Sequence, residues 1–159
     1  MKIVVVGDTL VSSDYMEKQA ERLFPGHDKE IVKFDWEMKT KEEFQEVILD
    51  LEKNGPEARK LSEEITNELK DADILMVHFA PVSKATLDKA VNLKLIGTCR
   101  GGVEHIDIEA ATEKNIPVLH VIRNAEPVAE FTLGLIYSEC RNITRSHVSI
   151  INGGWRKSF

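Results

Sequence analysis

Short apolar runs alternate with amphipathic stretches along most of this chain of 159 residues. The first run, residues 3–6, reads Ile-Val-Val-Val and ends at Gly7. A continuous β-branched run of this kind predicts a strand that is buried on both faces of a parallel sheet. Comparable runs predict four further strands, at residues 30–34, 74–79, 93–98 and 116–119.

Helix signals separate the predicted strands. Ser12 or Ser13 can cap a helix that runs through Leu23, and Thr40 with Glu43 three residues later has the form of a capping box. Strands that alternate with helices indicate βαβ crossovers. We therefore expect an α/β fold, a doubly wound, flavodoxin-like parallel sheet of about five strands.

The stretch from residue 125 to residue 150 differs from the rest. It lacks Pro and Gly except for Pro127 and Gly134, which predicts one helix of about 39 Å. One stripe recurs at three- and four-residue steps: Ala129, Leu133, Ile136, Cys140, Ile143, His147 and Ile150. Because this stripe is too long for one small domain to cover, we expect the helix to reach beyond its domain and to form a homodimer.

Composition narrows the possible partners and compartment. A formal charge of −6 and a pI of about 5.4 argue against a nucleic-acid partner. No apolar run approaches the roughly 20 residues of a membrane span, and no signal peptide is legible. Cys99 and Cys140 have neither metal-ligand nor redox spacing, so we expect a cytoplasmic protein with reduced cysteines and no metal site.

Two adjacent glycines give the clearest functional signal. Gly101 and Gly102 follow the predicted strand at residues 93–98, and open parallel sheets bind ligands beyond the carboxyl ends of their strands. Glycines can adopt positive φ and come close to a ligand. Their backbone N–H groups can hold a carboxylate, aided by the basic side chain of Arg100. The alternative is a tight turn without a ligand.

Two polar residues extend this candidate site. Asn124 precedes the long predicted helix, where it can act as an N-cap, as a substrate contact, or as both. His78 ends a predicted strand and would face the same cleft, although a histidine there is also typical of a hydrogen-bonded structural residue.

The chain shows no legible catalytic set. No G-x-G-x-x-G follows a predicted strand, so the residues that would seat a pyrophosphate at a helix N-terminus are missing. We also find no Ser-His-Asp or Cys-His arrangement.

Three motifs in fixed order carry a family resemblance: LKLIGTCRGGVEHIDIEAATEKNIPVLHV, then RNAEPVAEFTLGLI, then GGW. From Asp71 to Trp155 the chain resembles the D-isomer-specific 2-hydroxyacid dehydrogenases, a family that includes phosphoglycerate dehydrogenase. Arg100 is a departure, because a glycine usually stands there.

The resemblance implies hydride transfer between NAD or NADP and a small anionic 2-hydroxy or 2-oxo acid. It implies substrate contacts at Gly101, Gly102 and Asn124, and a cofactor contact at Gly101. Residues 1–122 would form the substrate-binding domain, and residues 123–159 a crossover helix and the start of a dinucleotide-binding domain. The catalytic Arg, Glu and His of the family would then lie outside this chain, which we expect to be inactive alone. The alternative is a non-catalytic α/β module that binds an organic acid or a protein partner.

Overall fold

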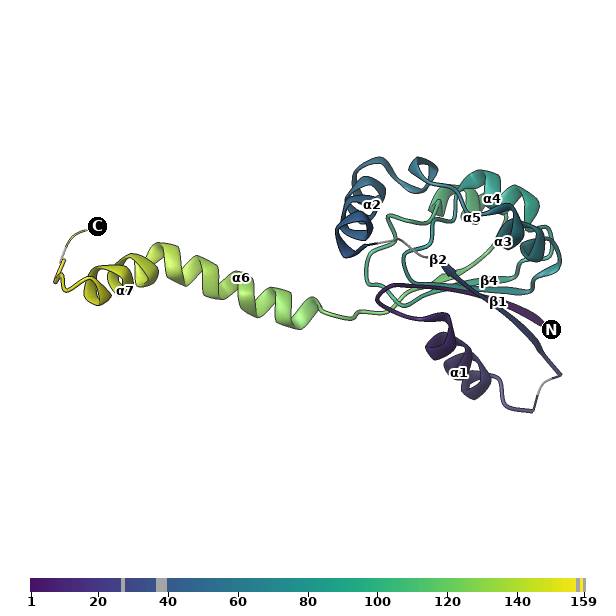
Figure 1. The fold of residues 1–159 in the computed structure, drawn as a ribbon, viewed down its shortest axis with the longest axis horizontal. Helices are drawn as coiled ribbons and strands as arrows, with labels where there is room; N and C mark the ends of the chain where they lie inside the picture. Colours follow the sequence, from purple (N-terminus) through teal and green to yellow (C-terminus); the bar gives the residue numbers. More distant parts are fainter. Residues whose placement is uncertain (27, 37–39, 157, 159) are drawn as a thin grey trace. The chain divides into compact units, whose positions relative to one another are not determined.

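The computed structural model describes residues 1–26, 28–36, 40–156 and 158. The chain divides into two units, Met1–Val121 and Ile122–Phe159 (Figure 1). The first unit holds a five-stranded sheet of order β2-β1-β3-β4-β5, and every pair of neighbours is parallel. The strands are β1 Lys2–Asp8, β2 Glu30–Trp36, β3 Ile74–Val77, β4 Leu95–Thr98 and β5 Val118–Leu119. The predicted α/β fold is thereby confirmed.

Helices cover both faces of the sheet. Helix α1, Ser13–Leu23, lies on one face (Figure 1). The opposite face carries α2 Lys41–Asn54, α3 Glu63–Glu68, α4 Lys84–Lys89 and α5 Ile108–Glu113. Two 3-10 turns flank α3, namely η1 Pro56–Ala58 and η2 Leu69–Asp71.

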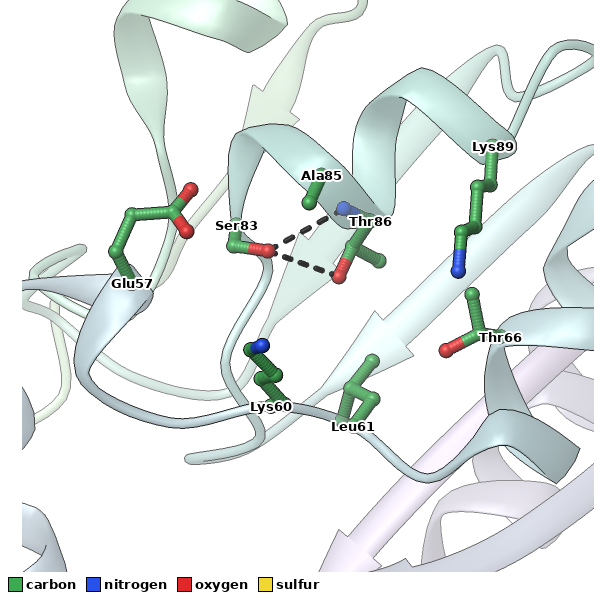
Figure 2. A pocket seen from close by; sticks show the side chains of 8 residues that line it. All are labelled: Glu57, Lys60, Leu61, Thr66, Ser83, Ala85, Thr86 and Lys89. Atoms are coloured by element: carbon green, nitrogen blue, oxygen red, sulfur yellow. Dashed lines mark hydrogen bonds between the residues drawn. The ribbon is translucent and has the colours of Figure 1, made fainter.

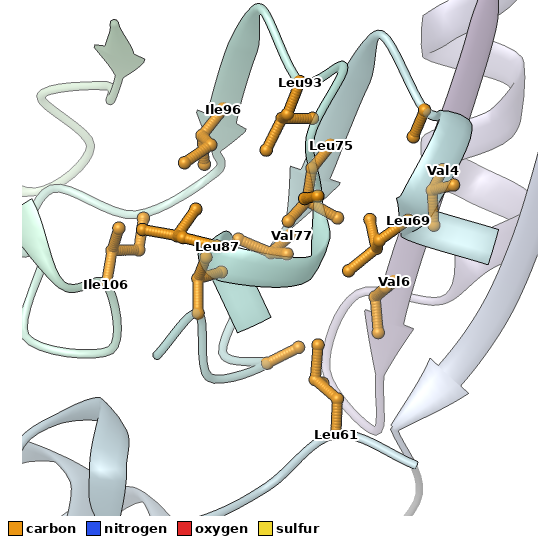
Figure 3. Packing of buried hydrophobic residues seen from close by; sticks show 14 of the residues in the cluster. Val4, Val6, Leu61, Leu69, Leu75, Val77, Leu87, Leu93, Ile96 and Ile106 are labelled. Atoms are coloured by element: carbon orange, nitrogen blue, oxygen red, sulfur yellow. The ribbon is translucent and has the colours of Figure 1, made fainter. Parts of the chain in front are cut away.

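The central strand β1 divides the core into two layers. Val4 and Val6 belong to one buried cluster, Ile3 and Val5 to the other, and none of the four side chains has exposed surface. This is the alternation of side chains that a strand imposes. The larger cluster, on the face of α3 and α4, includes Leu69, Leu75, Val77, Leu87 and Ile96 (Figure 3).

Local capping chemistry fixes where the helices begin. Ser12 caps α1 by accepting the N–H of Tyr15 at 3.3 Å, which decides between the two predicted serines. Thr40 accepts the N–H of Glu43 at 3.0 Å at the start of α2, as the capping-box pattern predicts. Each cap satisfies one N–H group that would otherwise lack a partner in the first helical turn.

The second unit corrects the prediction of one continuous helix. It contains α6 Ala125–Cys140 and α7 Ile143–Ile151, with a break between them. The break occurs because Asn142 adopts the left-handed conformation, with φ 55° and ψ 32°, which asparagine tolerates better than most residues. The carbonyl of Asn142 then accepts the N–H of Ser146 at 2.8 Å and begins the next helix. None of the described helices is long and apolar enough to cross a membrane.

Candidate functional site

A buried carboxylate joins two strand ends at the carboxyl edge of the sheet. Asp8, the last residue of β1, is 4% exposed. Its Oδ2 accepts hydrogen bonds from His78 Nδ1 at 2.8 Å and from the N–H of Phe79 at 3.1 Å. Its Oδ1 accepts the N–H groups of Leu10 and Val11 at 2.9 and 3.1 Å. The carboxylate therefore ties β1 to the end of β3 and fixes the turn that follows β1.

These contacts keep Asp8 ionised. Burial raises the pKa of the Asp8 carboxyl, but the hydrogen bond and charge of His78 and the two N–H groups of the turn lower it, and the net pKa lies below the ordinary value. Because a carboxylate can only accept, His78 Nδ1 carries the proton of their shared hydrogen bond.

A second buried chain of hydrogen bonds begins at the end of β4. Thr98 Oγ1 donates to the carbonyl of His78 at 3.4 Å and accepts the N–H of Arg100 at 3.3 Å. It also lies 3.1 Å from His105 Nε2. Since the hydroxyl proton is already donated, His105 donates from Nε2, and its Nδ1 is left as an acceptor. That buried Nδ1 has no hydrogen-bond partner among the residues that the structure describes.

Arg100 lies between an aromatic ring and two carboxylates. Its guanidinium carbon is 3.7 Å from the centroid of the Phe79 ring, a cation–π arrangement. Nη2 donates to Glu52 Oε1 on α2 at 3.1 Å. Glu104 Oε2 is 3.7 Å from Nη1, too far for a hydrogen bond. With the side chain only 15% exposed, Nη1 is a buried donor that no described residue satisfies.

The carbonyl groups of the glycine turn are hydrogen-bonded, whereas its two glycine N–H groups have no described acceptor. The Gly101 carbonyl accepts His120 Nδ1 at 2.9 Å, and the Arg100 carbonyl accepts the N–H of Val121 at 3.0 Å. The N–H groups of Gly101 and Gly102 donate to no residue in the described parts of the chain. Neither glycine has positive φ, so the turn does not use that freedom of the glycine backbone. Gly102 instead leaves room for a carboxylate, because an added β-carbon would collide with that of Glu104.

The structure brings together some of the predicted residues. Arg100, Gly101 and Gly102 share one turn at the end of β4. His78 is linked to this turn through Thr98, but its side chain is fully buried and bonded to Asp8. Its proposed contact with substrate stays a prediction.

Asn124 belongs to the second unit and stands immediately before α6. It occupies the predicted N-cap position, and its carbonyl accepts the N–H of Val128 at 3.1 Å, but its side chain makes no cap hydrogen bond. Its substrate role stays a prediction.

Most of the chain matches a known protein family. The profile of the D-isomer specific 2-hydroxyacid dehydrogenase catalytic domain matches residues 31–152. The chain belongs to that family.

Two curated relatives show how much of a family member the chain represents. It is 42% identical over 100 residues to D-3-phosphoglycerate dehydrogenase of Methanocaldococcus jannaschii, covering 61% of this chain and 19% of that protein. It is 36% identical over 118 residues to glyoxylate reductase of Thermofilum pendens, covering 72% of this chain and 33% of that protein. The chain therefore spans a third or less of the length of each relative.

Solved structures of dehydrogenases share the fold. NAD-dependent formate dehydrogenase of Staphylococcus aureus, in complex with NAD, superposes with a TM-score of 0.55 at 24% identity, covering 98% of this chain and 42% of that one. NAD+-bound 3-phosphoglycerate dehydrogenase of Entamoeba histolytica gives 0.56 at 22% identity, covering 87% and 38%. At these identities the comparison supports the fold alone.

The first βα turn of this 2-hydroxyacid dehydrogenase domain does not fit a dinucleotide. Asp35 accepts the N–H and the hydroxyl of Ser13 at 2.8 and 2.9 Å, so a carboxylate already occupies the start of α1. Gly7 packs so closely that an added β-carbon would collide with the backbone of Ser12 and Ser13. A pyrophosphate would meet like charge here instead of free N–H groups.

A separate hollow of about 160 Å³ lies beside α3 and α4 (Figure 2). Its buried hydroxyls are committed, because Ser83 Oγ accepts the N–H of Thr86 at 3.2 Å and lies 3.1 Å from Thr86 Oγ1. These bonds cap α4, so they account for the polar lining of the hollow without a ligand. No group of three His, Cys, Asp or Glu side chains in the described ranges could hold a metal ion.

The buried His105 predicts a pH-dependent stability. Burial, followed by the charges of Arg100 and His78, lowers the pKa of His105 from 6.5 to about 3. The folded state therefore gives up this proton while the unfolded state keeps it, and stability is lost as the pH falls from 6.5 toward 3. The expected contribution is roughly 1.4 kcal/mol per pH unit in that window. Denaturant titrations of His105→Gln between pH 6.5 and 4.5 should show a shallower slope than the unsubstituted chain. The exposed His120→Gln serves as the control, and an unchanged slope in His105→Gln would contradict the assignment.

Proposed function

We propose that this chain is the substrate-binding half of an NAD(P)-dependent D-2-hydroxyacid dehydrogenase. The enzyme would transfer hydride between the nicotinamide and C2 of a small 2-hydroxy or 2-oxo acid. The observation that carries the proposal is the unsatisfied Nη1 of Arg100 beside the glycine turn, in a chain that belongs to this family. A buried guanidinium nitrogen without an acceptor is costly, and a carboxylate oxygen would satisfy it.

The turn supplies further donors for the same anion. The N–H groups of Gly101 and Gly102 donate to no described residue, and no side chain projects from either glycine. Their peptide dipoles and the Arg100 charge would hold the acid by its carboxylate and present C2 to the cofactor. The cofactor contact of Gly101 and the contacts of His78 and Asn124 belong to this proposal.

The nicotinamide cofactor supplies the hydride chemistry when it is bound. The first βα turn does not offer a seat for its pyrophosphate, because Asp35 occupies the start of α1. The role that we assign to this chain is therefore to bind and orient the acid.

Binding of glyoxylate tests the anion site directly. Titration of the ¹⁵N-labelled chain with glyoxylate should shift the amide signals of Gly101 and Gly102. Arg100→Gln should weaken this binding roughly tenfold or more, because a hydrogen bond to a charged group contributes about 1.5–3 kcal/mol. Arg59→Gln is the matched control, since Arg59 is exposed at the surface, where it forms an ion pair with Asp50. Signals that do not move, or equal affinities in the two variants, would refute the proposal.

The chain alone should not catalyse the reaction. Without a pyrophosphate seat in its first βα turn, it should oxidise NADH with glyoxylate or hydroxypyruvate no faster than a blank without enzyme. The loss of NADH absorbance over time measures the rate of this oxidation. Turnover above the blank that scales with protein concentration would show that the expectation is wrong.

We further propose that α6 and α7 mediate a homodimer. Ile136, Ile143 and Ile150 are each about half exposed, and Phe131 is more so. Burial of such a side chain stabilises by about 1.5–3 kcal/mol, and a contiguous apolar surface usually marks an interface. The break at Asn142 means that the contact involves two short helices instead of one long stripe.

Light scattering at tens of micromolar tests this contact. The chain should have a dimeric mass, and Ile143→Glu should make it monomeric because the carboxylate would be buried. Val91→Glu, at an exposed apolar position of the first unit, should stay dimeric. A monomeric mass for the unsubstituted chain would rule out the dimer.

A further inference from the structure

Glu104 lies where the substrate anion is proposed to bind. Both oxygens of its carboxylate occupy the space that a β-carbon at Gly102 would enter, beside the glycine turn. One of them is 3.7 Å from the unsatisfied Nη1 of Arg100. The side chain is 46% exposed, and its contact with Arg100 at 3.7 Å is longer than a hydrogen bond, so it can swing into solvent at little cost.

The nearby carboxylates carry more negative charge than the single positive charge of Arg100 can balance. Glu52 binds Nη2 at 3.1 Å, and Glu104 stands beside Nη1. One positive charge therefore faces two negative charges. In this partly buried location, screening by salt is weaker than at an open surface.

From this geometry we infer that Glu104 determines substrate selectivity at the site. It would occupy the anion position until a substrate carboxylate displaces it. The site would then favour small 2-oxo acids whose only negative charge is the carboxylate, and it would disfavour phosphorylated acids. This inference rests on the proposed function, because it requires the carboxylate to bind at the Gly101–Gly102 turn.

The selectivity would arise because Glu52 and Glu104 repel each negative charge that a ligand carries. A monocarboxylate replaces the Glu104 carboxylate at the turn and leaves the local charge balance nearly unchanged. A phosphorylated acid brings at least one more negative charge within a few ångströms of Glu52 and Glu104, and no second described cation contacts this cluster. At such distances the repulsion between like charges exceeds thermal energy even with solvent screening.

The experiment compares two acids on one set of variants. Titrations of the ¹⁵N-labelled chain with glyoxylate and with 3-phosphoglycerate, at equal ionic strength, give the ratio of their affinities at the Gly101 and Gly102 amides. The unsubstituted chain should bind glyoxylate more tightly. Glu104→Gln, which keeps the shape and removes the charge, should strengthen 3-phosphoglycerate binding roughly tenfold and glyoxylate binding about threefold. Glu109→Gln removes the same charge from an exposed position on α5 and should leave the ratio unchanged.

The possible results distinguish the selectivity role of Glu104 from the anion site itself. If glyoxylate shifts the two amides but the ratio is the same in Glu104→Gln and Glu109→Gln, the selectivity role of Glu104 is wrong and the anion site stands. Tighter binding of 3-phosphoglycerate by the unsubstituted chain would also overturn the inference. If neither acid shifts the amides, both the inference and the proposed function fail.

Discussion

The Asp8 carboxylate is the constraint on which the carboxyl edge of the sheet depends. It is buried and ionised, and it accepts four hydrogen bonds, from His78, Phe79, Leu10 and Val11. A buried carboxylate that lost these donors would be strongly unfavourable, so the ends of β1 and β3 are held in one arrangement. In a sheet of this order the change of direction lies between β1 and β3, where such folds usually bind ligands. Here protein side chains fill that position, and the open donors lie one strand further, at the end of β4.

The position of the turn after β4 depends on the Asp8 carboxylate, through His78 and Thr98. Thr98 donates to the carbonyl of His78 and accepts from Arg100, which places the turn relative to β3. Phe79 then provides the flat surface on which the guanidinium of Arg100 rests, with the ring of Phe44 packed edge-on against Phe79. A planar guanidinium suits this position better than a lysine ammonium, because it stacks on the ring, donates to Glu52 through Nη2 and still leaves Nη1 available as a donor.

Much of the fold could be predicted because its signals are local. The β-branched run of β1, the serine and threonine caps and the capping box each act within a few residues. The break between α6 and α7 could not be predicted from apolar periodicity, since it depends on the left-handed backbone of Asn142 and the periodicity continues across it.

The candidate site could be predicted only in part. The turn was legible from its two glycines, but their backbone angles were not. Glu52 is 48 residues from Arg100, and Asp8 is 70 residues from His78, so only the packed structure identifies these partners. Glu104 stands four residues after Arg100 without lying on a helix with it, and its place over Gly102 depends on how the loop folds.

Asp35 couples the stability of α1 to the charge of the first βα turn. Its carboxylate accepts the N–H at the start of α1, where an anion stabilises a helix. On β2, Asp35 stands opposite Gly7 of the neighbouring strand β1. Loss of the Asp35 side chain would remove the negative charge from this turn but would also leave the Ser13 N–H without its acceptor. A single substitution would therefore destabilise the helix before any nucleotide contact existed to compensate. In this chain the start of α1 is therefore stabilised by a protein carboxylate, at a turn that also lacks the glycines of a dinucleotide fingerprint.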